Sequence, residues 1–282
     1  MPSFRYVVAD VFTSRPLEGN QLAVFTDARE LPEHRLQALA RELSLPETVY
    51  VYPPESGGHA RIRIFTPATE LPFAGHPVLG AAFVLGAPMQ LPEILLETGR
   101  GTVAIALERG EEGRLEFGRM GQPVPTFAPY PERDEALAAL GAGALAPVEL
   151  YDNGVRHVLV LLGSAEEVAA LEPDRAALRR LDGDAFNCFA GGGSTWKTRM
   201  FGPRLGIDED PATGSAAGPI ACHLARHGLI PFGEEIELSQ GAEVGRPSVL
   251  YARAEGSGDS IERVEVGGCA VVVARGEFRL AA

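Results

Sequence analysis

Lysine is almost absent from this chain of 282 residues, in which Lys197 stands alone against 24 arginines. A pyridoxal enzyme or a Schiff-base aldolase needs a lysine amine, so Lys197 would have to supply it. It lies in the alternating segment STWKTRMF, which predicts a strand with the lysine facing solvent. Schiff-base chemistry is therefore disfavoured.

Cysteine and long apolar runs are also scarce. The three cysteines, Cys188, Cys222 and Cys269, are widely spaced and form no C-x-x-C motif, which argues against a disulfide framework and a structural zinc site. The first residues lack the basic start and apolar run of a secretory signal. Runs such as Val158–Leu162 are too short to span a bilayer. We expect a soluble, cytoplasmic protein without a metal ion.

Positive charge is in deficit, since 25 basic residues face 38 acidic ones and the net charge is −13. Such a surface repels phosphate backbones and anionic lipid, so neither nucleic acid nor membrane is an expected partner. Neither G-x-x-x-x-G-K-[ST] nor G-x-G-x-x-G occurs. The usual sequence support for binding nucleotide phosphates is therefore missing.

The chain does contain an internal repeat. Four landmarks recur in the same order at offsets of 135 to 142 residues: GNQLAVF and GVRHVLV, RIRIFTP and KTRMFGP, GHPVLGAAFVL and GSAAGPIACHL, ILLETG and IELSQG. The alternative is that any two α/β stretches share a rhythm of strand, glycine and helix. A true repeat predicts two similar domains that face each other across a pseudo-two-fold axis.

The repeat suggests a division of the chain into two domains. We expect an N-terminal domain over residues 1–122 and a C-terminal domain over 123–269, with a linker in the loop-like segment Gly121–Pro131. The segment 270–282 lies beyond the second repeat and could return to the first domain.

Hydrophobic periodicity gives the elements. Segments such as RYVVADVF, NQLAVF, TVYVY and ARIRIF predict strands. Amphipathic helices are predicted over Pro32–Leu43 and Glu166–Leu181. Helices that are apolar nearly all round, and hence buried, are predicted over Pro77–Leu85 and Gly214–His227. Further glycine and proline clusters predict loops over Pro53–Gly58 and Gly191–Gly193.

Small or polar residues open both apolar helices, in ELPFAGHP before the first and EDPATGS before the second. A helix start exposes unpaired N–H groups and a positive dipole end. Gly75 and Gly214 would let a ligand approach the backbone, so each start is a candidate carboxylate site. If the repeat is real, both starts point at one cleft between the domains.

Four side chains near these starts are candidates for chemistry. His76 is placed to present an imidazole to a ligand, although a lone histidine is more often structural. Asp210 precedes Pro211 and also suits an N-cap, and Ser215 could equally be a helix-start hydroxyl without a ligand. Glu47 precedes an apolar strand, where a raised pKa would let it act as acid and base in turn.

His223 and His227 have the i, i+4 spacing of helical metal ligands. The segment HLARH offers no acidic third ligand. We therefore expect a solvated helix face there.

At these residues the sequence resembles the PhzF-like family. The matching segments, in family order, are DVFTSRPLEGNQLAVF, LPETVYVY, FTPATELPFAGHPVLGAA, YDNGVRHVLV, GIDEDPATGSAAGP, QGAEVGRPS and VGGCAVVVARGEF. The resemblance implies the diaminopimelate-epimerase-like fold, an α+β fold of two pseudo-symmetric domains in which a curved, mainly antiparallel sheet wraps around a central helix. It also implies a cofactor-free isomerase that forms a homodimer.

The resemblance further implies roles for the candidate residues. Glu47 would move a proton between carbons of a small cyclic or unsaturated carboxylic acid such as trans-2,3-dihydro-3-hydroxyanthranilate. His76 and Asp210 would complete the catalytic site. Ser215 would bind the substrate carboxylate together with the backbone near Gly75 and Gly214.

Amino-acid epimerases of the same fold use two opposed cysteines, one at each helix start. The corresponding positions here are Ala74 and Thr213, so racemisation by two thiols is disfavoured. Tyr50, Phe73 and the loop Gly191–Trp196 would line the pocket and set substrate choice. The alternative function is a non-catalytic protein that binds a small anion or serves as a scaffold on this fold.

Overall fold

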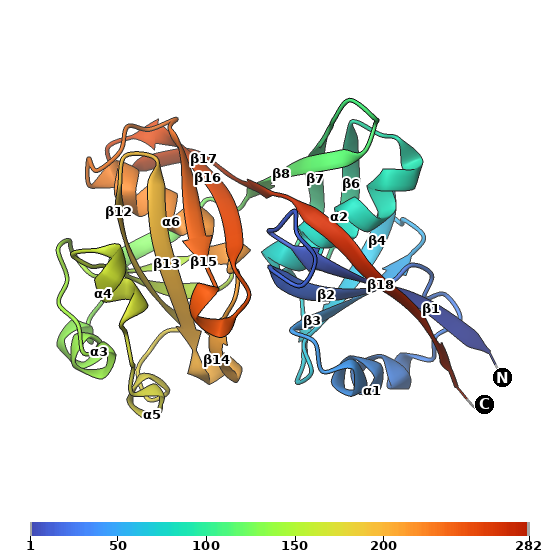
Figure 1. Cartoon of the computed structure of the whole chain (residues 1–282), viewed down its shortest axis with the longest axis horizontal. Coiled ribbons are helices and arrows are strands. Elements are labelled where there is room, and N and C mark those ends of the chain that lie inside the picture. The colour runs from blue at the N-terminus through green and yellow to red at the C-terminus, as the bar shows by residue number, and fades with distance from the viewer. Residues whose placement is uncertain (1, 281–282) are drawn as a thin grey trace. The chain divides into compact units, whose positions relative to one another are not determined.

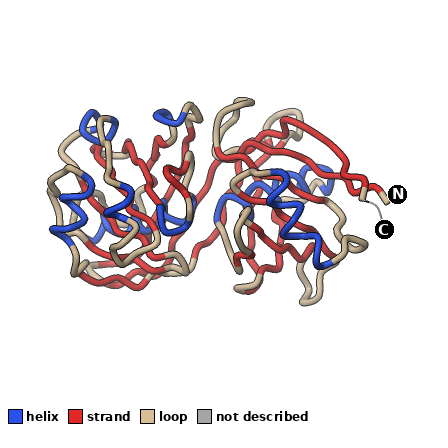
Figure 2. Tube along the Cα trace, turned by 90° about the horizontal axis from the view of Figure 1, so that it is seen from below, coloured by secondary structure: helices blue, strands red, loops and turns tan. Residues whose placement is uncertain are grey.

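A computed structural model of the chain describes residues 2–280, which form two compact units. The first unit comprises Met1–Gly121 and Gly267–Ala282, and the second comprises Gln122–Val266. The chain therefore leaves the first unit near residue 121 and re-enters it near residue 267. Strands and helices pack together in both units, which gives the α+β class expected from the sequence (Figure 2).

The first unit is a mainly antiparallel sheet with two helices. Its elements are β1 (Ser3–Val11), β2 (Asn20–Phe25), α1 (Glu33–Leu43), β3 (Glu47–Tyr52), β4 (Ala60–Phe65), β5 (Glu70–Leu71), α2 (Gly75–Met89), β6 (Glu93–Thr98), β7 (Gly101–Arg109), β8 (Leu115–Gln122) and β18 (Ala270–Arg279). The last strand returns from the far end of the sequence to lie antiparallel beside β1 (Figure 1).

The second unit has the same kind of sheet. Its elements are β9 (Thr126–Pro129), α3 (Arg133–Leu140), β10 (Glu149–Asp152), β11 (Arg156–Leu161), α4 (Ala165–Ala169), α5 (Arg175–Leu178), β12 (Ala185–Gly192), β13 (Thr195–Gly202), β14 (Ile207–Asp210), α6 (Gly214–Arg226), β15 (Glu235–Gln240), β16 (Ser248–Ser257) and β17 (Ser260–Gly268), with 3-10 turns at Pro203–Leu205 and Ala242–Val244.

The strand pairings of the two units match one for one. In the first unit β18–β1–β2 is antiparallel, β2–β3 parallel, β3–β4–β5 antiparallel, β4–β6 parallel and β6–β7 antiparallel. The second unit repeats this series as β9–β10–β11, β11–β12, β12–β13–β14, β13–β15 and β15–β16. Thus β18 takes the place in the first unit that β9 takes in the second.

One apolar helix lies against one face of each sheet, the inner face, as its sequence predicts. Helix α2 packs on β1, β2 and β6, and α6 packs on β11, β15 and β16. The approach of α2 is close, because a Cβ atom on Gly80 would lie 2.6 Å from Leu22 and 2.7 Å from Val11. Helix α6 begins at Gly214 as predicted, whereas α2 begins at Gly75, two residues before the predicted Pro77, and continues past Leu85 to Met89.

The outer face of each sheet carries a separate apolar core. In the first unit α1 covers a cluster that includes Phe25, Leu36 and Tyr50. Tyr50 is fully buried there, and its hydroxyl donates a hydrogen bond to the Leu36 carbonyl over 2.6 Å. The expectation that Tyr50 lines a substrate pocket is therefore wrong, because its ring and hydroxyl are both used in packing.

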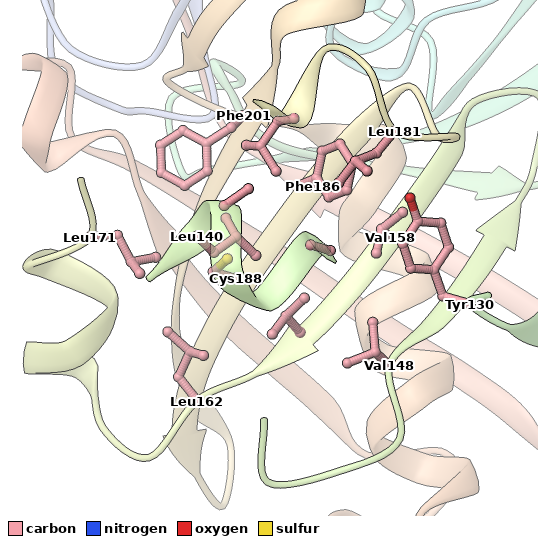
Figure 3. Packing of buried hydrophobic residues seen from close by; sticks show 14 of the residues in the cluster. Tyr130, Leu140, Val148, Val158, Leu162, Leu171, Leu181, Phe186, Cys188 and Phe201 are labelled. Atoms are coloured by element: carbon pink, nitrogen blue, oxygen red, sulfur yellow. The ribbon is translucent and has the colours of Figure 1, made fainter. Parts of the chain in front are cut away.

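The outer core of the second unit lies between β11–β13 and the helices α3, α4 and α5. Figure 3 shows Leu140, Phe186 and Phe201 among the apolar side chains that fill this space. One amphipathic helix over Glu166–Leu181 was expected here, and that expectation is wrong. Ser164 caps α4 and Asp174 caps α5 after Pro173, so the segment folds as two short helices.

Two segments expected to be loops contain strand residues. Gly191 and Gly192 end β12, which leaves only Gly193 and Ser194 in the turn to β13. The segment Gly121–Pro131 includes β9, which pairs with β10. Among the described residues, no helix combines the length and apolar character needed to cross a membrane.

Candidate functional site

Glu47 is the first residue of β3, and the local sequence places it there. Helix α1 ends at Leu43, and Ser44 caps it with a φ of 53°, the left-handed conformation common after a helix. The chain bends at Leu45 and Pro46 before β3 begins. In the parallel pairing of β2 and β3, Glu47 lies opposite Leu22. The Glu47 side chain is buried.

His76 is the second residue of α2 and is also buried. Its Nε2 atom lies 3.1 Å from Oε2 of Glu47. Burial lowers the pKa of His76 to about 3, although a hydrogen bond with the Gln21 backbone acts in the opposite direction. The imidazole is therefore neutral at ordinary pH.

The tautomer of His76 follows from these contacts. A backbone bond that raises the pKa of an imidazole is one in which the ring N–H donates to a carbonyl. Since Nε2 faces Glu47, the N–H toward Gln21 is on Nδ1. Nε2 is then an acceptor, so the protonated form of Glu47 can donate to it.

Asp210 and Thr213 lie on the segment between β14 and α6. Asp210 is the last residue of β14, and its Oδ2 accepts a hydrogen bond from the Thr213 hydroxyl over 2.7 Å. The N-cap of α6 is Thr213, not Asp210. The interpretation of Asp210 as a helix cap with Pro211 at the first helical position is therefore wrong, and its carboxylate instead accepts the Thr213 hydroxyl.

Gln240, at the end of β15, fixes this segment. Its amide nitrogen donates to the Asp210 carbonyl over 2.8 Å and to the Thr213 hydroxyl over 2.9 Å, and its amide oxygen accepts the Thr213 N–H over 3.0 Å. Gly241 follows with φ +81°, and a Cβ there would lie 2.4 Å from the Pro211 carbonyl. Only glycine therefore lets β15 approach the segment this closely.

The starts of α2 and α6 have the same character. Neither helix has an acidic residue in its first turn or a side chain that caps its first N–H groups. Gly75 and Gly214 are the first residues of the two helices and are buried, while Ser215 is half-buried. Each start can therefore offer backbone N–H groups to a carboxylate.

The structure thus describes two groups of the expected residues. Glu47 and His76 are in contact in the first unit, at the start of α2 near Gly75. Asp210 lies in the second unit, on the segment that leads into Gly214 and Ser215 at the start of α6. The supporting side chains were missed in the sequence: they are Gln240, Thr213, Gln122 and Asn153. Gln240 and Asn153 lie inside QGAEVGRPS and YDNGVRHVLV, so the motifs contained the signal without showing the partners.

The cysteines are placed differently from catalytic thiols. Burial raises the pKa of Cys188 and of Cys222 to about 12, so both stay protonated. Cys269 is half-buried, and burial raises its pKa as well.

The single lysine does not face solvent as expected. The Lys197 ammonium lies 2.7 Å from the Glu243 carboxylate, and its side chain is 17% exposed.

His223 and His227 also differ from expectation. His223 is fully buried, and the acidic partner missing from HLARH comes from β10: Oε2 of Glu149 lies 3.2 Å from His223 Nδ1 and 3.1 Å from His227 Nε2. These three ligand-type atoms lie within 4.8 Å of one another. However, the Arg226 guanidinium reaches the same carboxylate oxygen over 2.8 Å, so this group forms an ion-pair network in which Arg226 already holds the cationic position.

Comparison with known proteins identifies a family for this chain. The model of the family described as phenazine biosynthesis-like protein matches residues 9–276. A trans-2,3-dihydro-3-hydroxyanthranilate isomerase of Pseudomonas aeruginosa is 52% identical over 98% of this chain and 99% of its own. An enzyme of the same name from Pseudomonas fluorescens is 51% identical over 98% and 99% of the two chains.

Solved structures agree on the fold. A phenazine biosynthesis protein of the PhzF family from Bacillus anthracis superposes with a TM-score of 0.88 at 21% identity, covering 99% of this chain and 100% of that one. A PhzF-family protein from Enterococcus faecalis has a TM-score of 0.78 at 30% identity with the same coverage. The expected resemblance and fold are therefore confirmed.

Proposed function

The chain belongs to the phenazine biosynthesis-like protein family and is an isomerase, and on this premise we propose that it isomerises trans-2,3-dihydro-3-hydroxyanthranilate with Glu47 as general acid and base. The observation that carries the proposal is the buried contact of 3.1 Å between Glu47 and His76 beside the start of α2. A carboxyl in that position can take up a proton and give it back.

In this mechanism Glu47, as a carboxylate, removes a proton from one carbon of the substrate. The same carboxyl then returns the proton to another carbon on the same face, so no electrons leave or enter the substrate. Neutral His76 accepts the hydrogen bond of protonated Glu47 through Nε2 and holds it between the two steps. General acid–base catalysis of this kind accounts for about 10²–10⁴-fold in rate.

The remaining candidate residues bind the polar parts of the substrate. Ser215 and the N–H groups at Gly214 and Gly75 bind the carboxylate, as helix starts without acidic residues allow. Asp210 binds the amine or hydroxyl of the substrate and stabilises charge that develops there. No cofactor takes part in this proposal.

The test is a time course in D2O followed by NMR, with wild type, Glu47→Gln and the surface control Glu93→Gln. Glu47→Gln keeps the size of the side chain but cannot accept the proton. We expect wild type and Glu93→Gln to isomerise the substrate with deuterium incorporation, and Glu47→Gln to be slower by about 100-fold or more.

Two results would count against the proposal in different ways. Equal turnover by wild type and Glu47→Gln would remove Glu47 as the catalytic base. No turnover by wild type would remove this substrate, and deuterium exchange into other small unsaturated carboxylic acids would then identify the class on which the isomerase acts.

We further propose that the enzyme acts in the cytoplasm as a homodimer, in line with the family resemblance. Light scattering coupled to size-exclusion chromatography distinguishes a dimer of twice 29.9 kDa from a monomer. A monomeric mass at the protein concentrations used in the assay would contradict the dimer.

A further inference from the structure

Helix α6 contains a proline in its first half, Pro219. A helical proline has no N–H, so the carbonyl four residues earlier loses its donor. That carbonyl belongs to Ser215, which the proposed function assigns to the substrate carboxylate. The residue that binds the ligand therefore lies on a turn with a missing backbone hydrogen bond.

Asn153 provides the missing donor. It lies in the turn between β10 and β11, and its Nδ2 atom donates to the Ser215 carbonyl over 2.9 Å. The neighbouring carbonyl of Gly214 also accepts a side-chain amide, from Gln122 Nε2 over 2.8 Å. Both first carbonyls of α6 are thus held by side chains that belong to other segments.

Strand β10, which leads into the turn that contains Asn153, also contacts the C-terminal end of α6. Glu149, the first residue of β10, binds His223 and Arg226 in the last turns of α6. The strand and its turn therefore fix α6 at both ends, through Glu149 at the C-terminal end and Asn153 at the N-terminal end. A rotation of the first turn would break the bond to Asn153.

From these contacts we propose that Asn153 is a positioning residue of the isomerase: its side-chain amide replaces the N–H that Pro219 lacks and fixes the Ser215 backbone for binding of the substrate carboxylate. This inference rests on the proposed function. Asn153 acts through Ser215 and not on the substrate.

The relation between Asn153 and Pro219 gives a sharp test. Asn153→Ala removes the donor, and we expect KM for trans-2,3-dihydro-3-hydroxyanthranilate to rise about 5- to 20-fold while kcat changes less than about threefold, because the bond supports binding. Asn153→Asp keeps the size but not the donor and should behave like Asn153→Ala. Pro219→Ala restores a backbone N–H, so the double variant Asn153→Ala/Pro219→Ala should regain most of the affinity.

A purely structural role would not produce this pattern. Unchanged KM in Asn153→Ala, or a loss that Pro219→Ala does not relieve, would overturn the proposal. The melting temperature of each variant distinguishes a general loss of folding from a loss of substrate affinity. The Pro219→Ala variant alone should keep KM within about twofold of wild type.

A second readout does not depend on activity. Hydrogen exchange followed by mass spectrometry should show faster exchange in the peptide that covers residues 213–220 in Asn153→Ala, and slower exchange again in the double variant. If wild type fails to turn over the substrate, the proposed function falls and this exchange pattern still decides the role of Asn153. Equal exchange in wild type and Asn153→Ala would refute it.

Discussion

The Nε2 atom of His76 lies 3.1 Å from the Oε2 atom of Glu47, and both side chains are buried in the first unit. The Gln21 backbone determines which ring nitrogen carries the proton. Because the pKa of His76 is lowered to about 3, the imidazole reaches Glu47 as an uncharged acceptor. The pair therefore differs from an ion pair, because a neutral His76 adds no positive charge that would stabilise the Glu47 carboxylate.

His76→Gln should reduce kcat/KM by about 10²-fold, because the flexible amide of glutamine does not hold an acceptor where the imidazole Nε2 faces Glu47. The dependence of kcat/KM on pH between 5 and 9 should show no inflection from His76, because it stays neutral throughout. Steady-state kinetics across this range checks both statements. An inflection near pH 6.5 that disappears in His76→Gln would contradict the assignment of a neutral ring.

Gln240→Ala should impair the second group of residues. It leaves the Thr213 N–H and the Asp210 carbonyl without their side-chain partners, at a cost of about 1–3 kcal/mol in the free energy of unfolding for buried groups. We also expect kcat/KM to fall about 10-fold or more. Denaturant unfolding and kinetics measure the two effects, with Gln90→Ala as an exposed control.

Gln240→Glu refines this test. A glutamate keeps an acceptor for Thr213 but cannot donate to the Asp210 carbonyl, so it should resemble Gln240→Ala in kcat/KM. Wild-type kinetics in both variants would mean that the position of Asp210 does not depend on Gln240.

Much of the fold could be predicted from the sequence because it follows from local patterns. The buried helices α2 and α6 show as segments that are apolar nearly all round, and the repeat of strand, glycine and helix gives two similar units. The helix predicted over Glu166–Leu181 failed for a local reason as well. Its amphipathic pattern continues across Pro173 and Asp174, which end one helix and cap the next.

The site was harder to predict because its supporting contacts join residues far apart in sequence. Glu149 meets His223 across 74 positions, and Asn153 meets Ser215 across 62. The i, i+4 pair of histidines could be seen in HLARH, but its acidic partner on β10 could not. Tyr50 shows the same limit, since a tyrosine near a catalytic glutamate can face a pocket or the core, and only packing decides.

Buried His157 should make the protein less stable in acid. It contacts Asn187 in the second unit. The corresponding positions of the first unit hold Leu22 and Val49, which are apolar. Burial lowers the pKa of His157 to about 3. The unfolded chain takes up a proton below about pH 6.5 and the folded chain does not, so this group lowers the free energy of unfolding by about 1.4 kcal/mol for each pH unit between 6.5 and 3.

His157→Leu should therefore reduce this dependence on pH. Urea unfolding at pH 7 and pH 4.5 should show a smaller loss of stability in His157→Leu than in wild type, by about 2.6 kcal/mol over the interval. His34→Gln, which removes an exposed imidazole, serves as the control and should keep the wild-type difference. An equal loss of stability in His157→Leu and wild type would show that His157 is protonated in the folded protein.

Glu149→Gln should be among the most destabilising substitutions outside the site. Burial alone would raise the pKa of Glu149, but hydrogen bonds from His223, His227 and Arg226 outweigh it and hold the pKa well below its usual range. Removal of the charge leaves the Arg226 guanidinium without its buried partner, which costs about 3–5 kcal/mol in comparable pairs. The exposed pair of Glu277 and Arg279 gives the matched control, because solvent screens this pair and Glu277→Gln should cost far less than Glu149→Gln.

The dependence on pH separates this pair from a simple loss of packing. Because the folded pKa of Glu149 is depressed, its contribution to stability is present above the unfolded pKa of about 4.3 and is lost as pH falls further. The stabilities of wild type and Glu149→Gln should therefore begin to converge below about pH 4 in chemical unfolding and approach each other further as pH falls. A difference that stays constant from pH 7 to pH 3 would mean that Glu149 acts through its shape, and that Arg226 draws its stability from Asp259 and from the Phe127 ring beneath it.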